Sequence, residues 1–200
     1  MKILDIGCGN GSFINQVLKN KSIESYELTG IDFCKNNIDY ANKHFDGNFI
    51  NHDIKDVLPF EDNCFDVIIC ISTLIYLTNE IELQKVLSEI KRVCKDDSII
   101  FLGNCMDFDK KTLSKKLREK SHPLKSTHLY IKKIDIVKIF EKHKITITDL
   151  DELDLEFYTG QKYKFNILIE NIPKNNIKII TTERTEGIST TLIINKILNK

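Results

Sequence analysis

Short apolar runs alternate along the chain with longer stretches in which apolar residues recur every three or four positions. Residues 66–72 are apolar almost throughout, as expected of a strand that is covered on both faces. Residues 80–94 instead carry apolar residues at helical spacing. The pattern predicts strands at residues 2–6, 26–33, 48–51, 66–72 and 98–103, and helices at residues 12–19, 35–45, 80–94 and 133–143. This alternation predicts a parallel sheet with helices on both faces.

The first of these helices is expected to place four apolar side chains on one face, namely Phe13, Ile14, Val17 and Leu18. Two further strands, at residues 145–150 and 163–169, have no helix between them and predict an antiparallel hairpin at one edge of the sheet. A polar, lysine-rich insertion at about 106–130 interrupts the alternation. We expect it to lie over the carboxyl ends of the strands, where ligands bind in such sheets.

Composition and charge restrict the function. Two hundred residues suffice for one domain with a substantial core. Lys plus Arg and Asp plus Glu both number 29, which argues against nucleic acid as the main partner. The sequence contains neither an apolar run of about 18 residues nor a signal-peptide pattern, so no membrane span is expected. The 6 cysteines form no C-x-x-C pair; we expect free thiols in the cytoplasm and no metal site.

A glycine-rich loop, Gly7-Cys8-Gly9-Asn10-Gly11, follows the first predicted strand and opens the first predicted helix. Glycines let the backbone turn tightly and approach a ligand, and the helix N-terminus offers unpaired N–H groups. Asp32 lies at the end of the second predicted strand, where a carboxylate can bind both ribose hydroxyls of a nucleoside cofactor. Together with Asp5, this context favours a cofactor loop over a glycine-rich turn without a ligand.

The spacing of the glycines bears on which cofactor is bound. A dinucleotide site has the pattern G-x-G-x-x-G, whereas the third glycine here comes one residue early. The string from Ile3 to Gly11 resembles motif I of class I methyltransferases that use S-adenosyl-L-methionine (SAM). The resemblance continues in Gly30-Ile31-Asp32-Phe33, in Asn51-His52-Asp53-Ile54 and in the stretch from Leu58 to Ile68.

This resemblance implies a Rossmann-like, doubly wound α/β fold with a mostly parallel seven-stranded sheet, the edge hairpin and helices on both faces. It also implies a role for each matching residue. Asp5 would lie near the methionine amino group, Asp32 would bind the ribose, Phe33 would cover the adenine and Asp53 would bind the adenine amino group. The full set of expected cofactor-binding residues is Asp5, Gly7, Cys8, Gly9, Gly11, Asp32, Phe33, Asp53, Ile54 and Ile71, with Ser72 beside Ile71.

The sequence gives fewer signals for the residues that bind the methyl acceptor than for those that bind the cofactor. Transfer of a methyl group from a sulfonium mainly requires alignment of the nucleophile, and a general base only when the acceptor must lose a proton. The candidate catalytic residues are Tyr76, after the fourth predicted strand, and His128 or His122 in the insertion. The alternative is that Tyr76 is packing and that the histidines are solvated. Tyr158 and Tyr163 are candidates for capping the pocket.

The start of the chain departs from the family pattern. Most members carry a helix before motif I that closes over SAM, whereas here the first predicted strand begins at residue 2. We therefore expect a lid from the insertion, a second copy or a partner chain, or else a truncated reading frame. The missing helix favours one alternative to a methyltransferase acting on a small molecule, a non-catalytic SAM-fold partner subunit. A nicotinamide-dependent oxidoreductase is a further alternative, against which the glycine spacing and the lack of a Tyr-x-x-x-Lys motif argue.

The last 29 residues, 172–200, form a separate predicted tail after a methyltransferase domain at 1–171. We expect a strand at 177–180 and a helix at 188–198. Residues 183–191 resemble the R-T-E-G-I-S-T-T signature of cytidylyltransferases, although the H-x-G-H motif of that family is absent. The tail either extends the sheet or indicates an acceptor from a cytidylyl-activated pathway: a phospho-alcohol, an amine or a surface-glycan precursor.

Overall fold

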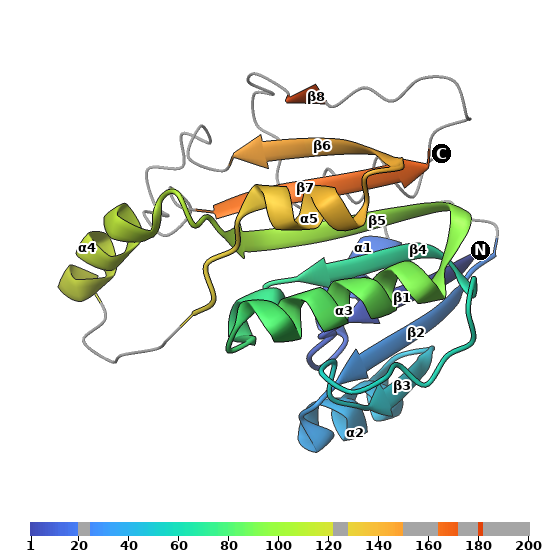
Figure 1. Cartoon of the computed structure of the whole chain (residues 1–200). Helices are drawn as coiled ribbons and strands as arrows, with labels where there is room; N and C mark the ends of the chain where they lie inside the picture. The colour runs from blue at the N-terminus through green and yellow to red at the C-terminus, as the bar shows by residue number, and fades with distance from the viewer. Residues whose placement is uncertain (20–24, 122–127, 150–163, 172–179, 182–200) are drawn as a thin grey trace.

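The computed structural model describes residues 1–19, 25–121, 128–149, 164–171 and 180–181. A single twisted sheet runs through the molecule with helices packed against it (Figure 1). Its strands are β1 (Lys2–Ile6), β2 (Glu27–Asp32), β3 (Asn48–Asn51), β4 (Phe65–Ile71), β5 (Cys94–Met106), β6 (His143–Asp149), β7 (Lys164–Asn171) and the two-residue β8 (Ile180–Thr181). The helices are α1 (Ser12–Lys19), α2 (Lys35–His44), the 3-10 turn η1 (Leu74–Tyr76), α3 (Glu80–Val93), α4 (Lys111–Ser121) and α5 (Lys133–Ile139).

The order of the strands across the sheet is β3-β2-β1-β4-β5-β7-β6, with β8 beside β6. Strands β1 to β5 are parallel, while β7 is antiparallel to both β5 and β6. The predicted seven-stranded, mostly parallel Rossmann-like sheet is confirmed. The β6–β7 hairpin is part of the same sheet. Strand β7 pairs with β5, and β6 lies farther from the centre of the sheet than β7.

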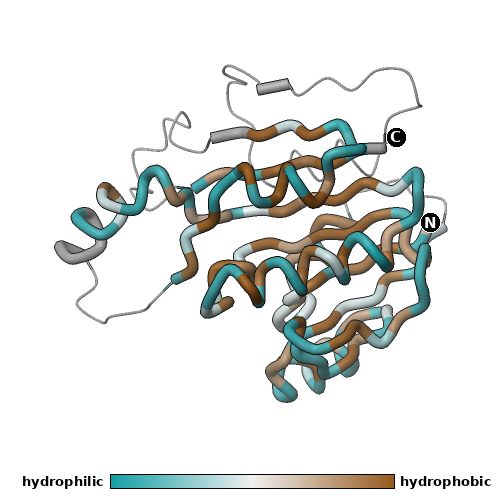
Figure 2. The backbone as a smooth tube through the Cα atoms, viewed as in Figure 1, coloured by the Kyte–Doolittle hydropathy of each residue, from teal (hydrophilic) through white to brown (hydrophobic). Residues whose placement is uncertain are grey.

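The helices cover both faces of the sheet, and the strand residues alternate between two cores. Leu4, Ile68 and Leu102 pack with α3 and α5 on one face. Ile3 and Val67 pack with α1 and α2 on the other. Figure 2 shows the result, with apolar strands inside and polar outer surfaces on the helices. Both faces of the central strands are buried, which explains why β4 is apolar almost throughout.

The order in which the strands are added to the sheet reverses at β1, since β2 and β3 lie on one side of it and β4 and β5 on the other. In doubly wound sheets ligands bind at the carboxyl ends of the strands beside such a reversal. The glycine loop follows β1 directly and therefore lies at this point. Among the described helices, none is long and apolar enough to cross a membrane.

Some predicted boundaries are wrong. Strand β5 begins at Cys94 rather than at residue 98, because Cys94 pairs with Phe65 before a register shift in β4. The insertion contains α4, which the sequence analysis missed, and α5 ends four residues early because β6 begins at His143. Phe13 is 41% exposed and does not belong to the buried face of α1. At about 100° per residue it lies at the edge of the face that Ile14, Val17 and Leu18 form.

Candidate active site

The glycine loop is held against the second strand by its backbone. The amide groups of Gly7 and Cys8 both donate to the carbonyl oxygen of Ile31, at 2.8 and 3.0 Å. Gly7 and Gly9 have φ angles of 72° and 54°, in the left-handed region. A Cβ on Gly7 would overlap the side chain of Thr73, whereas a Cβ on Gly9 would meet no heavy atom within 4 Å. Gly7 is therefore required by packing, while Gly9 leaves open space above the loop.

Asp32 ends β2 and connects the loop to the next helix. Its carboxylate oxygens accept hydrogen bonds from the amide of Gly9, at 3.0 Å, and of Cys34, at 2.9 Å. Asn51 holds the following turn by donating from Nδ2 to the carbonyl oxygens of Asp32 and Phe33. The Phe33 side chain is 75% exposed, although large aromatic rings are usually mostly buried. The turn thus presents an uncovered ring beside a fixed carboxylate.

Asp5 lies beneath the loop and is only 5% exposed. Burial, reinforced by the neighbouring Asp32 carboxylate, raises the pKa of Asp5 to about 7. When Asp5 is ionised, its carboxylate and that of Asp32 create a negative potential under the glycine loop. The floor of the site is therefore suited to a cationic group such as an ammonium.

These elements surround a cavity of about 340 Å³ at the carboxyl ends of β1, β2 and β4. Eight residues named from the sequence line it: Gly7, Asp32, Phe33, Asp53, Ile54, Ile71, Ser72 and Tyr76. Asp5, Cys8, Gly9 and Gly11 are not part of its lining. Cys8 instead packs into the core on the α1 and α2 face, where burial raises the pKa of its thiol. The cavity brings together four segments that are far apart in the sequence.

Three lining residues were missed by the sequence analysis, namely Lys55, Thr73 and Leu77. Thr73 lies two residues after the end of β4, and its hydroxyl donates to the carbonyl oxygens of Ile6 and Ile71, at 3.2 and 2.9 Å. It thereby holds the ends of β1 and β4 together over Gly7. The position of Thr73 near the end of a predicted strand could have marked it as a site residue. Its contact with β1 could not be predicted, because it depends on the order of the strands in the sheet.

A polar pair closes the side of the cavity next to β5. Ser72 and Asn104, at the ends of neighbouring strands, both have positive φ angles, of 56° and 57°. Nδ2 of Asn104 donates to Oγ of Ser72 at 2.8 Å. The amide of Asn104 donates to Oδ1 of the buried Asn166 at 2.8 Å, which ties this corner to β7. The strained backbone here is held by side-chain hydrogen bonds from three strands.

Two of the candidate catalytic residues, Tyr76 and His128, are in contact although 52 positions separate them. The rings of Tyr76 and His128 are perpendicular, with centroids 5.7 Å apart. Tyr76 lines the cavity and is 70% exposed, and His128 is half-buried. The amide of Leu129 donates to the carbonyl oxygen of Ile75 at 2.9 Å, which fixes the two segments side by side. His122, Tyr158, Tyr163 and the predicted tail elements lie outside the described residues, apart from β8.

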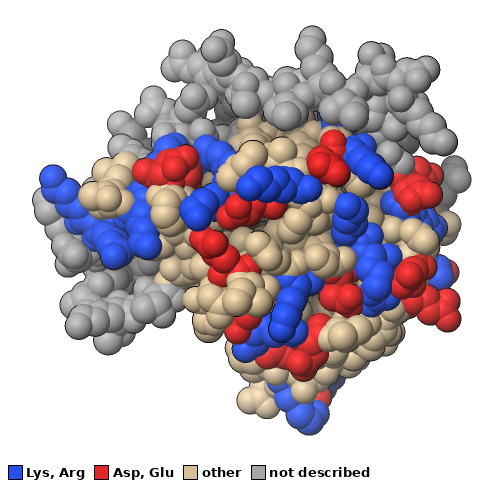
Figure 3. All heavy atoms as spheres, viewed as in Figure 1, with Lys and Arg blue, Asp and Glu red and all other residues tan. Residues whose placement is uncertain are grey.

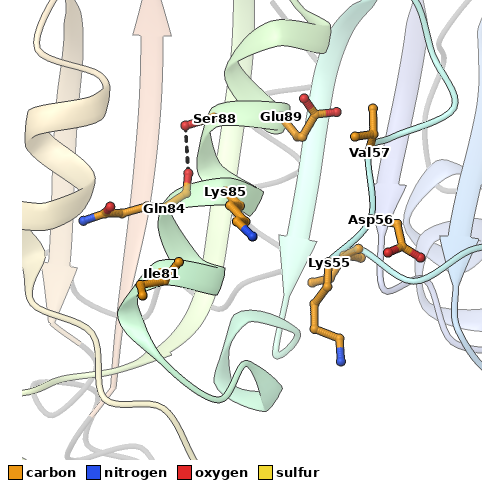
Figure 4. A pocket seen from close by; sticks show the side chains of 9 residues that line it. Lys55, Asp56, Val57, Ile81, Gln84, Lys85, Ser88 and Glu89 are labelled. Atoms are coloured by element: carbon orange, nitrogen blue, oxygen red, sulfur yellow. Dashed lines mark hydrogen bonds between the residues drawn. The ribbon is translucent and has the colours of Figure 1, made fainter.

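A second hollow of about 560 Å³ lies between residues 54–57 and α3 (Figure 4). It shares Ile54 and Lys55 with the cavity, so residues 53–57 form the wall between the two. Arg92 of α3 anchors the segment that follows this wall. It donates to the carbonyl oxygens of Leu58 and Phe60 and to the carboxylates of Asp62 and Glu89, at 2.7–3.0 Å.

The glycine loop, Asp32 at the end of β2 and the cavity beside them form one site. A family model described as "Methyltransferase domain" matches residues 1–164. The chain belongs to this methyltransferase family. The sequence resemblance is thereby confirmed over the range in which its motifs lie.

Individual relatives agree with the family. Sterol 4-C-methyltransferase strm-1 of Caenorhabditis elegans is 37% identical over 98 residues, which are 46% of this chain and 27% of the relative. The ubiquinone/menaquinone biosynthesis C-methyltransferase UbiE of Desulfotalea psychrophila is 32% identical over 111 residues, 54% of this chain and 41% of the relative. The chain thus spans less than half the length of these relatives. A SAM-dependent methyltransferase from Methanosarcina mazei shares the fold, with a TM-score of 0.63, 18% identity, and 86% and 92% of the two chains covered.

S-adenosyl-L-methionine is the cofactor that this family membership assigns to the site. The residues present fit it, because the loop is open above Gly9, Phe33 is uncovered and an acidic floor lies below. The nicotinamide alternative is set aside. The resemblance of residues 183–191 to cytidylyltransferases is not borne out, since the family match ends at residue 164 and the relatives found are methyltransferases. The domain boundary at 171 stays a prediction.

Proposed function

We propose that this protein transfers a methyl group from SAM to a small polar acceptor molecule. The observation that carries the proposal is the single cavity of about 340 Å³. Its lining includes the proposed cofactor residues Asp32, Phe33 and Asp53. It also includes the exposed Tyr76, which lies on the side where we expect the acceptor to bind. One space thus offers room for the cofactor and an opening toward a second molecule.

Each binding role follows from the position of a side chain. Asp32 would accept hydrogen bonds from the ribose hydroxyls, since each oxygen of its carboxylate keeps a lone pair beyond those used by Gly9 and Cys34. Phe33 would cover one face of the adenine, which would remove its exposed apolar surface from water. Asp53 would bind the adenine amino group. Asp5 would stabilise the ammonium of the methionine part through its negative charge.

The chemistry needs little covalent participation by the protein. SAM supplies a methyl group already activated by the positive sulfur. The residues of this chain have to align the nucleophile in line with it and keep water out. Tyr76 and His128 are the proposed groups on the acceptor side: Tyr76 would pack against the acceptor, and His128 behind it would take a proton where one is lost.

The acceptor is proposed only as a class. Both curated relatives are named as C-methyltransferases, of a sterol in one case and in ubiquinone and menaquinone biosynthesis in the other. The acceptors to be tested should therefore include molecules that are methylated on carbon as well as molecules that are methylated on oxygen or nitrogen. The phospho-alcohol, amine and glycan-precursor hypotheses from the tail lose their basis, because the tail resemblance is not borne out.

Compartment and assembly are also proposals. All 6 cysteines are free thiols, which supports a reducing compartment such as the cytoplasm. A second copy or a partner chain that covers Phe33 and Tyr76 would complete the closure of the cavity. Light scattering with and without S-adenosyl-L-homocysteine (SAH), the product form of the cofactor, would detect a second copy.

The test is a screen with SAM that carries a tritiated methyl group and a panel of carbon, oxygen and nitrogen acceptors. We expect label to move to at least one acceptor and Asp32→Ala to abolish the transfer. Asp39→Ala, an exposed carboxylate on α2, is the matched control and should keep full activity. SAH binding without any transfer would instead support the non-catalytic partner subunit, and absence of binding would contradict both.

A further inference from the structure

Lys111, the first residue of α4, is half-buried, and its ammonium lies over two aromatic rings. Its Nζ lies 5.4 Å from the ring centroid of Phe108 and 5.5 Å from that of Tyr130. The nearby lysines differ, since Lys132 pairs with Glu80 at 2.9 Å and Lys133 pairs with Asp107 at 3.0 Å.

Among the described residues, no carboxylate forms an ion pair with Lys111. Removing a charge from water is costly unless an opposite charge compensates for it. Two aromatic rings compensate in part, because each presents the negative face of its π system to the cation. The site is therefore prepared for an anion.

The contacts around α4 place Lys111 at the acceptor side of the cavity. The amide of Phe108 donates to the carbonyl oxygen of Ile131 at 3.1 Å, which fixes the start of the insertion. Ser114 Oγ and Tyr130 OH are 2.8 Å apart, so α4 is anchored on the same ring that Lys111 approaches. Tyr130 in turn packs on Ile75, the neighbour of the cavity residue Tyr76.

Positive charge gathers on the surface of this helix. Residues 108–121 contain five lysines and one arginine against one aspartate and one glutamate. Lys115 is exposed and lies one turn after Lys111, so both point to the same side of α4. Figure 3 shows the Lys and Arg side chains grouped over α4, which projects past the carboxyl end of β5 in Figure 1. Such a grouping attracts anions toward the opening of the site.

We propose that Lys111 and Lys115 bind an anionic group of the methyl acceptor, a phosphate or a carboxylate. The acceptor's reactive atom would then extend past Tyr130 and Tyr76 into the cavity. This inference rests on the proposed function and adds to it the charge of the substrate. The half-buried ring of Tyr130, which packs on the buried Ile75 and Met106 and lies beside the ammonium, fits an acceptor with an apolar part and one charged end.

The test uses inorganic pyrophosphate and malonate as probes, titrated into the full chain saturated with SAH. We expect at least one of them to bind, and Lys111→Met to weaken binding by about tenfold or more, as expected for the loss of one charge-assisted contact. Lys111→Arg should retain binding. Lys85→Met, an exposed lysine on α3, is the control that should leave it unchanged. Tighter binding of pyrophosphate would indicate a phosphate on the acceptor, and tighter binding of malonate would indicate a carboxylate.

Three results would overturn the inference: no binding of either probe, equal binding to wild type and Lys111→Met, or an equal loss in Lys85→Met. Displacement of SAH by pyrophosphate would also contradict it, because the anion would then occupy the glycine loop. SAH binding is recorded in the same titrations. Its absence in the wild type counts against the proposed function, whereas its presence with a failed probe experiment counts only against the anion site.

Discussion

Asp5 is the residue on which the pH behaviour of the site depends. Its pKa is raised to about 7, and the charged form is the one that stabilises an ammonium. SAH affinity should therefore fall by about tenfold between pH 8 and pH 6, as the carboxyl group takes up its proton. Calorimetric titrations of SAH at pH 6, 7 and 8 check this. A flat profile would show that Asp5 does not contribute its charge to binding.

Replacing Asp5 by a neutral residue should raise the stability of the folded state above neutral pH. The pKa of Asp5 is higher in the folded state than its ordinary value of 3.8. The folded state therefore keeps a proton that the unfolded chain loses, and stability falls as the pH rises from about 4 through about 7. Asp5→Asn removes this loss, so its Tm at pH 8 should exceed that of the wild type while its SAH affinity is lower. A lower Tm at pH 8 would contradict the account.

Gly7 and Gly9 form a matched pair of substitutions. Both have positive φ angles, so alanine is strained at either position, at a cost of about 1–2 kcal/mol. Only at Gly7 does the new methyl group also overlap Thr73. We expect Gly7→Ala to lower the Tm clearly more than Gly9→Ala, and Gly9→Ala to fold but bind SAH more weakly. Thermal melts with and without SAH distinguish them, and equal Tm losses would be the contrary result.

At the scale of elements, Arg92 connects α3 to the segment that leads into β4. Replacing it by alanine leaves the carbonyl oxygens of Leu58 and Phe60 without their donor and breaks the ion pair with Glu89. We expect Arg92→Ala to lower the free energy of unfolding by about 1–3 kcal/mol. Urea titrations measure this. Lys85→Ala on the same helix should change stability by less than about 0.5 kcal/mol, and a similar loss in both variants would refute the anchoring role.

The elements that the sequence predicts well are those that a buried apolar pattern determines locally. Helix α3 and strand β3 match their predicted ranges to within one residue. Strand β5 is longer than predicted because its polar start pairs with Phe65, a long-range contact that leaves no local pattern. Helix α4 was missed because most of its residues are charged or polar: Leu113 is exposed, and the residue that anchors the helix is the buried Ser114.

The site likewise contains residues that local sequence patterns predict and residues that depend on long-range contacts. The glycine loop and Asp32 were predictable because their spacing along the chain carries the signal. By contrast, Thr73 and the pairing of Tyr76 with His128 depend on the order of the strands.

At the scale of the whole molecule, the sheet order creates the site. β1 lies between β2 and β4, so the loops after all three strands meet at one cavity. The position of β7 next to β5 brings Asn166 to Asn104 and closes the far side. Neither arrangement follows from the pattern of any single segment, because both depend on pairings between residues 25 or more positions apart. The fold class could be predicted from local alternation, but the shape of the cavity could not.

The central claim is that this cavity holds SAM. The most direct measurement is a calorimetric titration of SAM and of NADH into the wild type and into Asp32→Ala at pH 8. We expect one SAM bound per chain in the wild type, a loss of at least tenfold in affinity in Asp32→Ala, and no heat from NADH. Absence of SAM binding at millimolar concentration, or binding that Asp32→Ala leaves unchanged, would contradict it.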